Sequence, residues 1–145
     1  MSVIFQVIAP RLLGPAIVVA AALIVKGYTD VGDGFSAGVI VGLAISLRYV
    51  TLGPEQAERA LGILRRAPAG VACGLLISLA VGFGPVLAGD PPFTHVPGPG
   101  EAVVRLGTLE LISAVAFDAG VFVLVTSVLV LLIHHLSSLI PERDA

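Results

Sequence analysis

Four long apolar runs constrain this 145-residue chain more than any other feature. A helix needs about 20 predominantly apolar residues to cross the roughly 30 Å hydrocarbon core of a bilayer. Runs long enough to do so occupy residues 3–25, 35–52, 67–89 and 111–140. We therefore predict an all-α integral membrane protein, with residues 1–145 forming one membrane domain built as a bundle of four transmembrane helices.

Composition supports a membrane protein and excludes several other classes. Hydrophobic residues make up 57% of the chain and charged residues only 12%, whereas a soluble domain carries about 25% charged residues. The net charge is -2, so the chain lacks the positive potential of a nucleic-acid-binding protein. We expect it to contact the lipid bilayer and to bind no nucleic acid. Its one cysteine, Cys73, excludes an internal disulfide framework.

The first run also has some features of a signal peptide, because Arg11 precedes an apolar stretch. The apolar residues before Arg11 fit a signal peptide poorly and favour a retained helix.

Near the end of the second run, Arg48 is placed where a long side chain can reach the membrane interface. Between the second and third runs, Pro54 precedes a short charged segment typical of an amphipathic surface helix.

The distribution of basic residues predicts the orientation of the bundle. Four spans place both termini and the loop at 51–66 on one side of the membrane. That side carries most of the basic residues, namely Arg11, Arg48, Arg59, Arg65, Arg66 and Arg143, and the other side carries Lys26 and Arg105. The positive-inside rule therefore predicts cytoplasmic N and C termini, with external loops at 26–34 and 90–110.

Small residues recur at every fourth position in two of the predicted helices. The two sets are Gly34, Gly38, Gly42 and Ser46, and Gly70, Gly74, Ser78 and Gly82. Each set forms a shallow groove along one face, which lets another helix approach closely. Two interpretations stay open: the two helices pack on each other through these grooves, or one groove receives a helix from a neighbouring protein.

Asp118 is the only acid deep inside a predicted span. An acid at the centre of a membrane helix costs about 2.5–3.5 kcal/mol on insertion scales, so its side chain should face protein or a water-filled cavity. One interpretation is a proton or cation relay on an ion pathway. The other is a buried polar contact that docks this helix against a neighbour. The sequence leaves both open.

The turn between the first two spans is rich in glycine and acids, with Lys26, Asp30, Gly32, Asp33, Gly34 and Phe35. Its carboxylates and carbonyls could hold a cation transiently at an external mouth, but a solvated tight turn explains the same residues more simply.

His134 and His135, near the end of the last run, indicate an interfacial role rather than a metal site. Since no catalytic constellation or cofactor fingerprint is present, we expect no enzyme, cofactor or bound metal.

Two segments together resemble the B-subunit (MnhB) domain family of the Mrp multisubunit cation/proton antiporters. Residues 26–38 read KGYTDVGDGFSAG and resemble the family's Gly-rich turn and the start of its second helix. Residues 116–121 read AFDAGV and are similar to its Phe-Asp-x-Gly-Val stretch. The sequence departs from the family at three positions: the family often has His where this chain has Tyr28, Pro where it has Val31, and Gly where it has Asp33. No role of the family's histidine therefore carries over to Tyr28.

The resemblance implies a small component of a bacterial inner-membrane complex that exchanges Na⁺ for H⁺ and serves pH homeostasis. Its partners would be the other antiporter subunits, of which the large ones are thought to carry much of the proton path. This chain would then contribute to assembly and to part of an ion pathway. Alternatives are the equivalent subunit of a membrane-bound hydrogenase or related respiratory complex, a free-standing homodimeric proton-coupled exporter, and an assembly factor.

Overall fold

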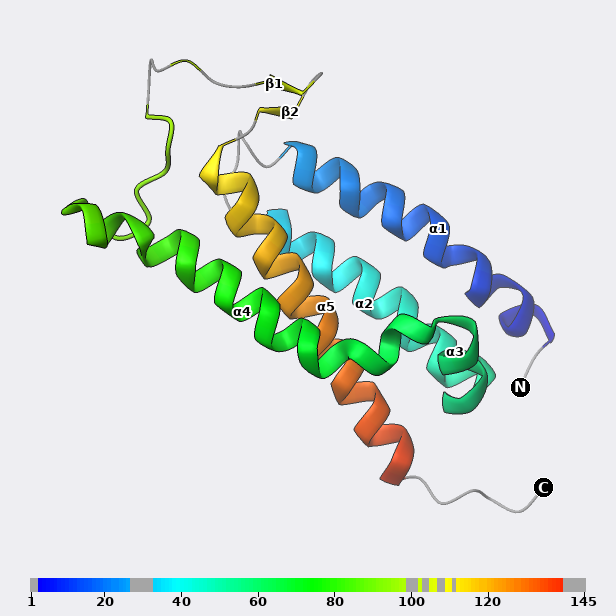
Figure 1. Cartoon of the computed structure of the whole chain (residues 1–145). Helices are drawn as coiled ribbons and strands as arrows, with labels where there is room; N and C mark the ends of the chain where they lie inside the picture. Colours follow the sequence, from blue (N-terminus) through cyan, green and yellow to red (C-terminus); the bar gives the residue numbers. More distant parts are fainter. Residues whose placement is uncertain are drawn as a thin grey trace.

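The computed structural model describes residues 3–26, 33–98, 102, 105–106, 109–110 and 112–139. Long helices dominate this part of the chain and lie side by side in alternating directions (Figure 1), namely α1 (Val3–Lys26), α2 (Asp33–Leu52), α4 (Ala67–Phe83) and α5 (Ser113–Leu139). In the described residues, four helical stretches are long and apolar enough to cross a membrane. The prediction of four membrane helices is confirmed.

Two of the predicted boundaries need correction. α2 begins at Asp33, so Asp33 and Gly34 belong to the first turn of this helix and not to the preceding loop. A carboxylate is favourable there because it faces the positive end of the helix dipole. The third span continues to residue 88, but its α-helix ends at Phe83 and its last turn is the 3₁₀ helix η2 (Gly84–Ala88). Pro85 explains the change, since it has no N–H to donate.

The connections contain short elements of their own. α3 (Pro54–Ala60) is the predicted surface helix, with Pro54 in its first turn, and the 3₁₀ helix η1 (Gly62–Arg66) leads from it into α4. The loop before α5 contains a two-stranded antiparallel ladder, in which β1 (Arg105–Leu106) pairs with β2 (Leu109–Glu110). We did not predict this ladder. Its strands are two residues long, which is too short to leave a recognisable alternation in the sequence.

The central helix of the bundle is α5. It packs against α4 on one side and α2 on the other, and α1 packs against α2 (Figure 1). The start of α1, the end of α2 and α3 lie at one end of the bundle. The end of α1, the start of α2, the β ladder and the start of α5 lie at the other. We refer to these as the α3 end and the loop end.

Of the two interpretations left open for the small-residue grooves, packing of the two grooves on each other is wrong, because most of both grooves faces α5. A methyl group added at Gly38 of α2 would lie 2.8 Å from the Val125 Cβ atom. One added at Gly74 of α4 would lie 2.7 Å from the Gly120 carbonyl oxygen. Because α5 carries a small residue of its own, Gly120, its backbone approaches α4 closely. Gly82 is an exception, since it faces the ring of Phe93 in the following loop.

Candidate functional site at the start of α5

Asp118 is the most deeply buried acid in the described part of the chain, with 1% of its surface exposed. It lies five residues after Ser113, the first residue of α5. At a rise of 1.5 Å per residue, this places it about 7.5 Å along the helix. The expectation that Asp118 lies deep within its span is therefore corrected. It is buried by protein, but it sits close to the loop end of the bundle.

The two segments singled out in the sequence meet at this position. A methyl group added at Gly34 would lie 2.7 Å from both the Cα and the carbonyl carbon of Asp118. Only glycine leaves room for this approach, because a Cβ contact shorter than 3 Å with backbone cannot be relieved by moving a side chain. The Gly-rich segment therefore positions the start of α2 directly against the acid of α5.

The other residues of the predicted turn are placed differently. Asp33 precedes Gly34 and is half-buried, and its Oδ2 atom accepts no hydrogen bond from the described residues. Lys26 is the exposed last residue of α1. Phe35 is 57% exposed and is not part of the core. Asp30 and Gly32 lie outside the described residues.

This arrangement places acids of two different helices at the loop end of the bundle. Asp118 is enclosed by protein, and Asp33 stands at the start of the helix packed against it. Carboxylates in such surroundings can exchange a proton or bind a monovalent cation briefly, since carboxylate oxygens suit hard cations.

Polar side chains also hold α5 and α1 on α2. The Thr126 hydroxyl of α5 donates to the Gly38 carbonyl oxygen of α2 at 3.3 Å. The Arg48 guanidinium of α2 donates to the Pro10 carbonyl oxygen of α1 at 3.0 Å. Arg48 was expected to extend to the membrane interface, and it instead joins two helices.

A second polar cluster, at the α3 end, was missed by the sequence analysis. The Nδ1 atom of His134 lies 2.8 Å from Oε1 of Glu58, to which the Tyr49 hydroxyl also donates at 3.4 Å. The Nε atom of Arg65 lies 3.9 Å from the other Glu58 oxygen. The cluster ties α3 to the end of α5. Because Glu58 is far from His134 in sequence, only the amphipathic character of α3 could have indicated an inward-facing acid.

Two other histidines, His135 and His95, also have partners within the chain. The Nδ1 atom of His135 lies 2.8 Å from the Leu131 carbonyl oxygen of the preceding turn. His95, in the loop after η2, lies 3.2 Å from the Ser113 hydroxyl at the start of α5. The same hydroxyl accepts a hydrogen bond from the Val96 N–H at 2.8 Å. The two contacts of the Ser113 hydroxyl attach the loop to the helix that carries Asp118.

Comparison with known families gives a match over nearly the whole chain. Residues 4–131 match the family described as a domain related to the MnhB subunit of Na⁺/H⁺ antiporter. The match includes α1, α2, α4 and most of α5, and so it includes both segments that meet at Asp118.

Three curated relatives give the same picture. The Na⁺/H⁺ antiporter B subunit of Alkalihalophilus pseudofirmus is 30% identical over 106 residues, which is 73% of this chain and 72% of the relative. The protein of the same name from Bacillus subtilis is 30% identical over 112 residues, or 77% of this chain and 76% of the relative. A protein of Rhizobium meliloti, named as the probable A/B subunit of a K⁺/H⁺ antiporter, is 36% identical over 121 residues. That match covers 81% of this chain but only 12% of the much longer relative.

Proposed function

Since the chain belongs to the family of domains related to the MnhB subunit of Na⁺/H⁺ antiporters, we propose that it is the B subunit of a multisubunit cation/proton antiporter. Its partners are the other subunits of that complex, and the transported ions are H⁺ and a monovalent cation, with Na⁺ as the leading candidate. The protein is then part of a transporter and is not an enzyme. The observation that carries the proposal is the match over residues 4–131.

The architecture suits one member of a complex better than a complete transporter. Within the described residues, Asp118 is the one acid that is fully enclosed, and a single acid gives little means of coupling two ions that move in opposite directions. Large apolar side chains remain exposed along both outer helices, for example Val18 on α1 and Leu76 on α4, which are 69% and 67% exposed. Such faces suit lipid and neighbouring subunits.

We place the protein in the bacterial cell membrane with its termini in the cytoplasm. The support is the distribution of basic side chains over the two ends of the bundle. Arg59, Arg65 and Arg66 are exposed at the α3 end, and Arg11 lies in the first half of α1. Lys26 and Arg105 are at the loop end. The positive-inside rule puts the more basic end in the cytoplasm.

Within the complex, we assign Asp118 and the start of α2 to an ion pathway. A buried carboxylate within a membrane span is costly to keep and marks functional positions in membrane proteins. Asp118 lies about 7.5 Å from the first residue of α5, at the loop end of the bundle. An ion from the external side would arrive at this end.

Purification of the intact complex tests the proposal. The chain, tagged at one terminus in its native host, is extracted in mild detergent and the copurifying proteins are identified by mass spectrometry. We expect the large and small subunits of a cation/proton antiporter. Copurification of hydrogenase or quinone-reductase subunits, or recovery of the chain alone as a homodimer, would refute it.

A further inference from the structure

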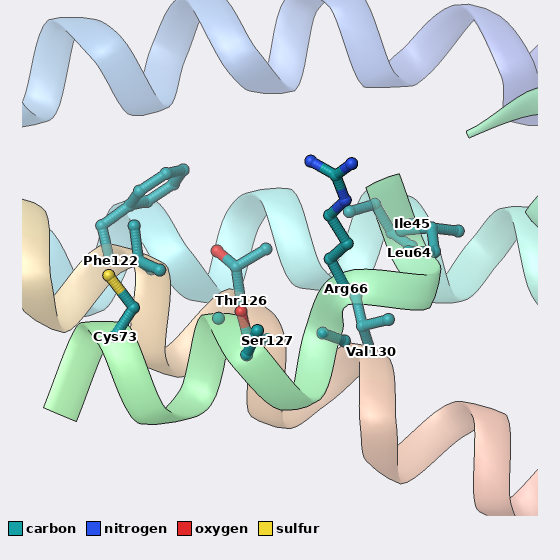
Figure 2. A pocket seen from close by; sticks show the side chains of 12 residues that line it. Ile45, Leu64, Arg66, Cys73, Phe122, Thr126, Ser127 and Val130 are labelled. Atoms are coloured by element: carbon teal, nitrogen blue, oxygen red, sulfur yellow. The ribbon is translucent and has the colours of Figure 1, made fainter. Parts of the chain in front are cut away.

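A groove of about 390 Å³ opens on the bundle where α2, α4 and α5 meet. Its walls are apolar over most of their length, with Ile45 from α2, Cys73 from α4, and Phe122, Val123 and Val130 from α5. Arg66, at the junction of η1 and α4, is the charged residue that lines it. Figure 2 shows Arg66 beside Leu64 and Ile45, with Phe122 and Cys73 toward the opposite end.

The groove is short enough to lie within one leaflet of a bilayer. From Arg66 to Cys73 the helix rises about 10 Å, at 1.5 Å per residue. One leaflet contributes about 15 Å of the roughly 30 Å hydrocarbon core. Arg66 immediately precedes the first residue of α4, so it stands where a membrane span meets the interface. The apolar part of the groove therefore lies at the depth of acyl chains and its charged rim lies at the depth of head groups.

The lining of the groove favours a lipid as its occupant. An acyl chain can lie along the apolar walls between α2, α4 and α5, and Arg66 offers a partner to an anionic head group at the rim. A phospholipid carries both of these chemical groups in one molecule.

The charge at the rim selects the head group. Arg59 pairs with Glu55 at 3.4 Å, and Arg65 lies 3.9 Å from Glu58. Arg66 is exposed, and no carboxylate in the described ranges forms an ion pair with it. Basic pockets between membrane helices on the cytoplasmic side bind anionic lipid head groups. We propose that this groove binds one acyl chain of an anionic phospholipid, whose phosphate group pairs with Arg66.

Photo-crosslinking tests this site directly. The complex is purified through the tagged chain and reconstituted in phosphatidylcholine vesicles containing phosphatidylglycerol with a photoreactive acyl chain. We expect labelling of groove residues such as Cys73 and Val123. Arg66→Gln should lower it about fivefold, the effect of losing one basic residue near an anionic head group. Arg59→Gln, which removes a neighbouring arginine that already has an internal partner, should leave labelling unchanged.

Two further arms separate the alternatives. Phosphatidylcholine with the same photoreactive chain should label the groove only as weakly as phosphatidylglycerol labels the Arg66→Gln variant. Cys73→Phe fills the groove and should prevent labelling of Val123 by either lipid. Equal labelling by the two lipids, or no effect of Arg66→Gln, overturns the proposal. Persistent labelling of Val123 in Cys73→Phe overturns it as well. So does a thiol-specific crosslink from Cys73 to a neighbouring protein in place of lipid.

Discussion

At the scale of single residues, the contact between Gly34 and Asp118 joins the two most informative segments of the sequence. The Asp118 carboxylate lies near the end of a membrane helix, and its burial means that it faces protein and not lipid. The backbone of Gly34 closes one side of its surroundings. This gives Asp118 a fixed position, which a residue on an ion pathway needs.

Replacing Asp118 with Asn tests the assignment to an ion pathway. The amide is nearly the same size but cannot take up and release a proton in the same way. We expect Na⁺-dependent proton exchange in membrane vesicles to fall to the level of vesicles that lack the chain, with normal assembly of the complex. Asp90→Asn, in an exposed loop position, is the matched control and should keep full exchange.

The outcome also separates the two roles of Asp118. Loss of assembly in Asp118→Asn would make the residue a structural contact, and normal exchange with normal assembly would remove it from the ion pathway.

Arg48 allows a second test at this scale. Its guanidinium donates to the Pro10 carbonyl oxygen and joins α2 to α1, and hydrogen bonds of charged groups contribute about 1.5–3 kcal/mol. Arg48→Gln should therefore loosen α1, seen as faster amide hydrogen exchange in the first half of that helix. Arg11→Gln is the control, because the Arg11 guanidinium donates to the Val7 carbonyl of its own helix. Equal rates of amide hydrogen exchange in α1 of the two variants would show that the contact between Arg48 and Pro10 does not stabilise this helix.

At the scale of helices, α5 organises the bundle. It is the longest of the helices, with 27 residues, and it lies between two helices whose small residues face it. Lipid tails are as apolar as leucine, so membrane helices associate through close packing and hydrogen bonds more than through hydrophobic burial. The glycines of α2 and α4 provide that close packing, and Thr126 adds a hydrogen bond to α2.

Replacing Gly38 with Leu should separate α2 from α5. The first atom of the new side chain would lie 2.8 Å from Val125 and 3.1 Å from the Phe122 carbonyl oxygen. Overpacking by even small groups costs about 1–3 kcal/mol, so we expect a lower Tm and a lower yield of purified complex. Gly14→Leu, where nothing lies within 4 Å, should be neutral within this chain. Unchanged Tm and yield in Gly38→Leu would contradict the packing described.

Which helix each groove faces could not be predicted from the sequence. The spacing of Gly34, Gly38 and Gly42 shows that one face of α2 is small, because every fourth residue lies on the same face. It carries no information about the partner. Four membrane helices followed directly from the apolar runs, since the thickness of a bilayer fixes their length. The hydrogen bond of Arg48, the position of Glu58 and the meeting of Gly34 with Asp118 depend on tertiary packing.

At the scale of the whole molecule, the orientation in the membrane is open to a direct test. In a Cys73→Ser background, single cysteines are introduced at Glu55 in α3 and at Pro92 in the loop before α5, both of which are exposed. A membrane-impermeant maleimide added to intact cells whose outer membrane is permeable should label Pro92→Cys only. Glu55→Cys should react after the inner membrane is opened. The reverse pattern would invert the proposed orientation.

Proton exchange in membrane vesicles bears most directly on the proposed function. Everted vesicles are prepared from cells that lack the gene for this chain and from cells in which it is restored, and a pH-sensitive fluorescent dye reports proton movement when Na⁺ or K⁺ is added. We predict that cation-induced proton efflux is lost without the chain and recovered with it. Equal efflux from the two preparations would contradict its role in a cation/proton antiporter.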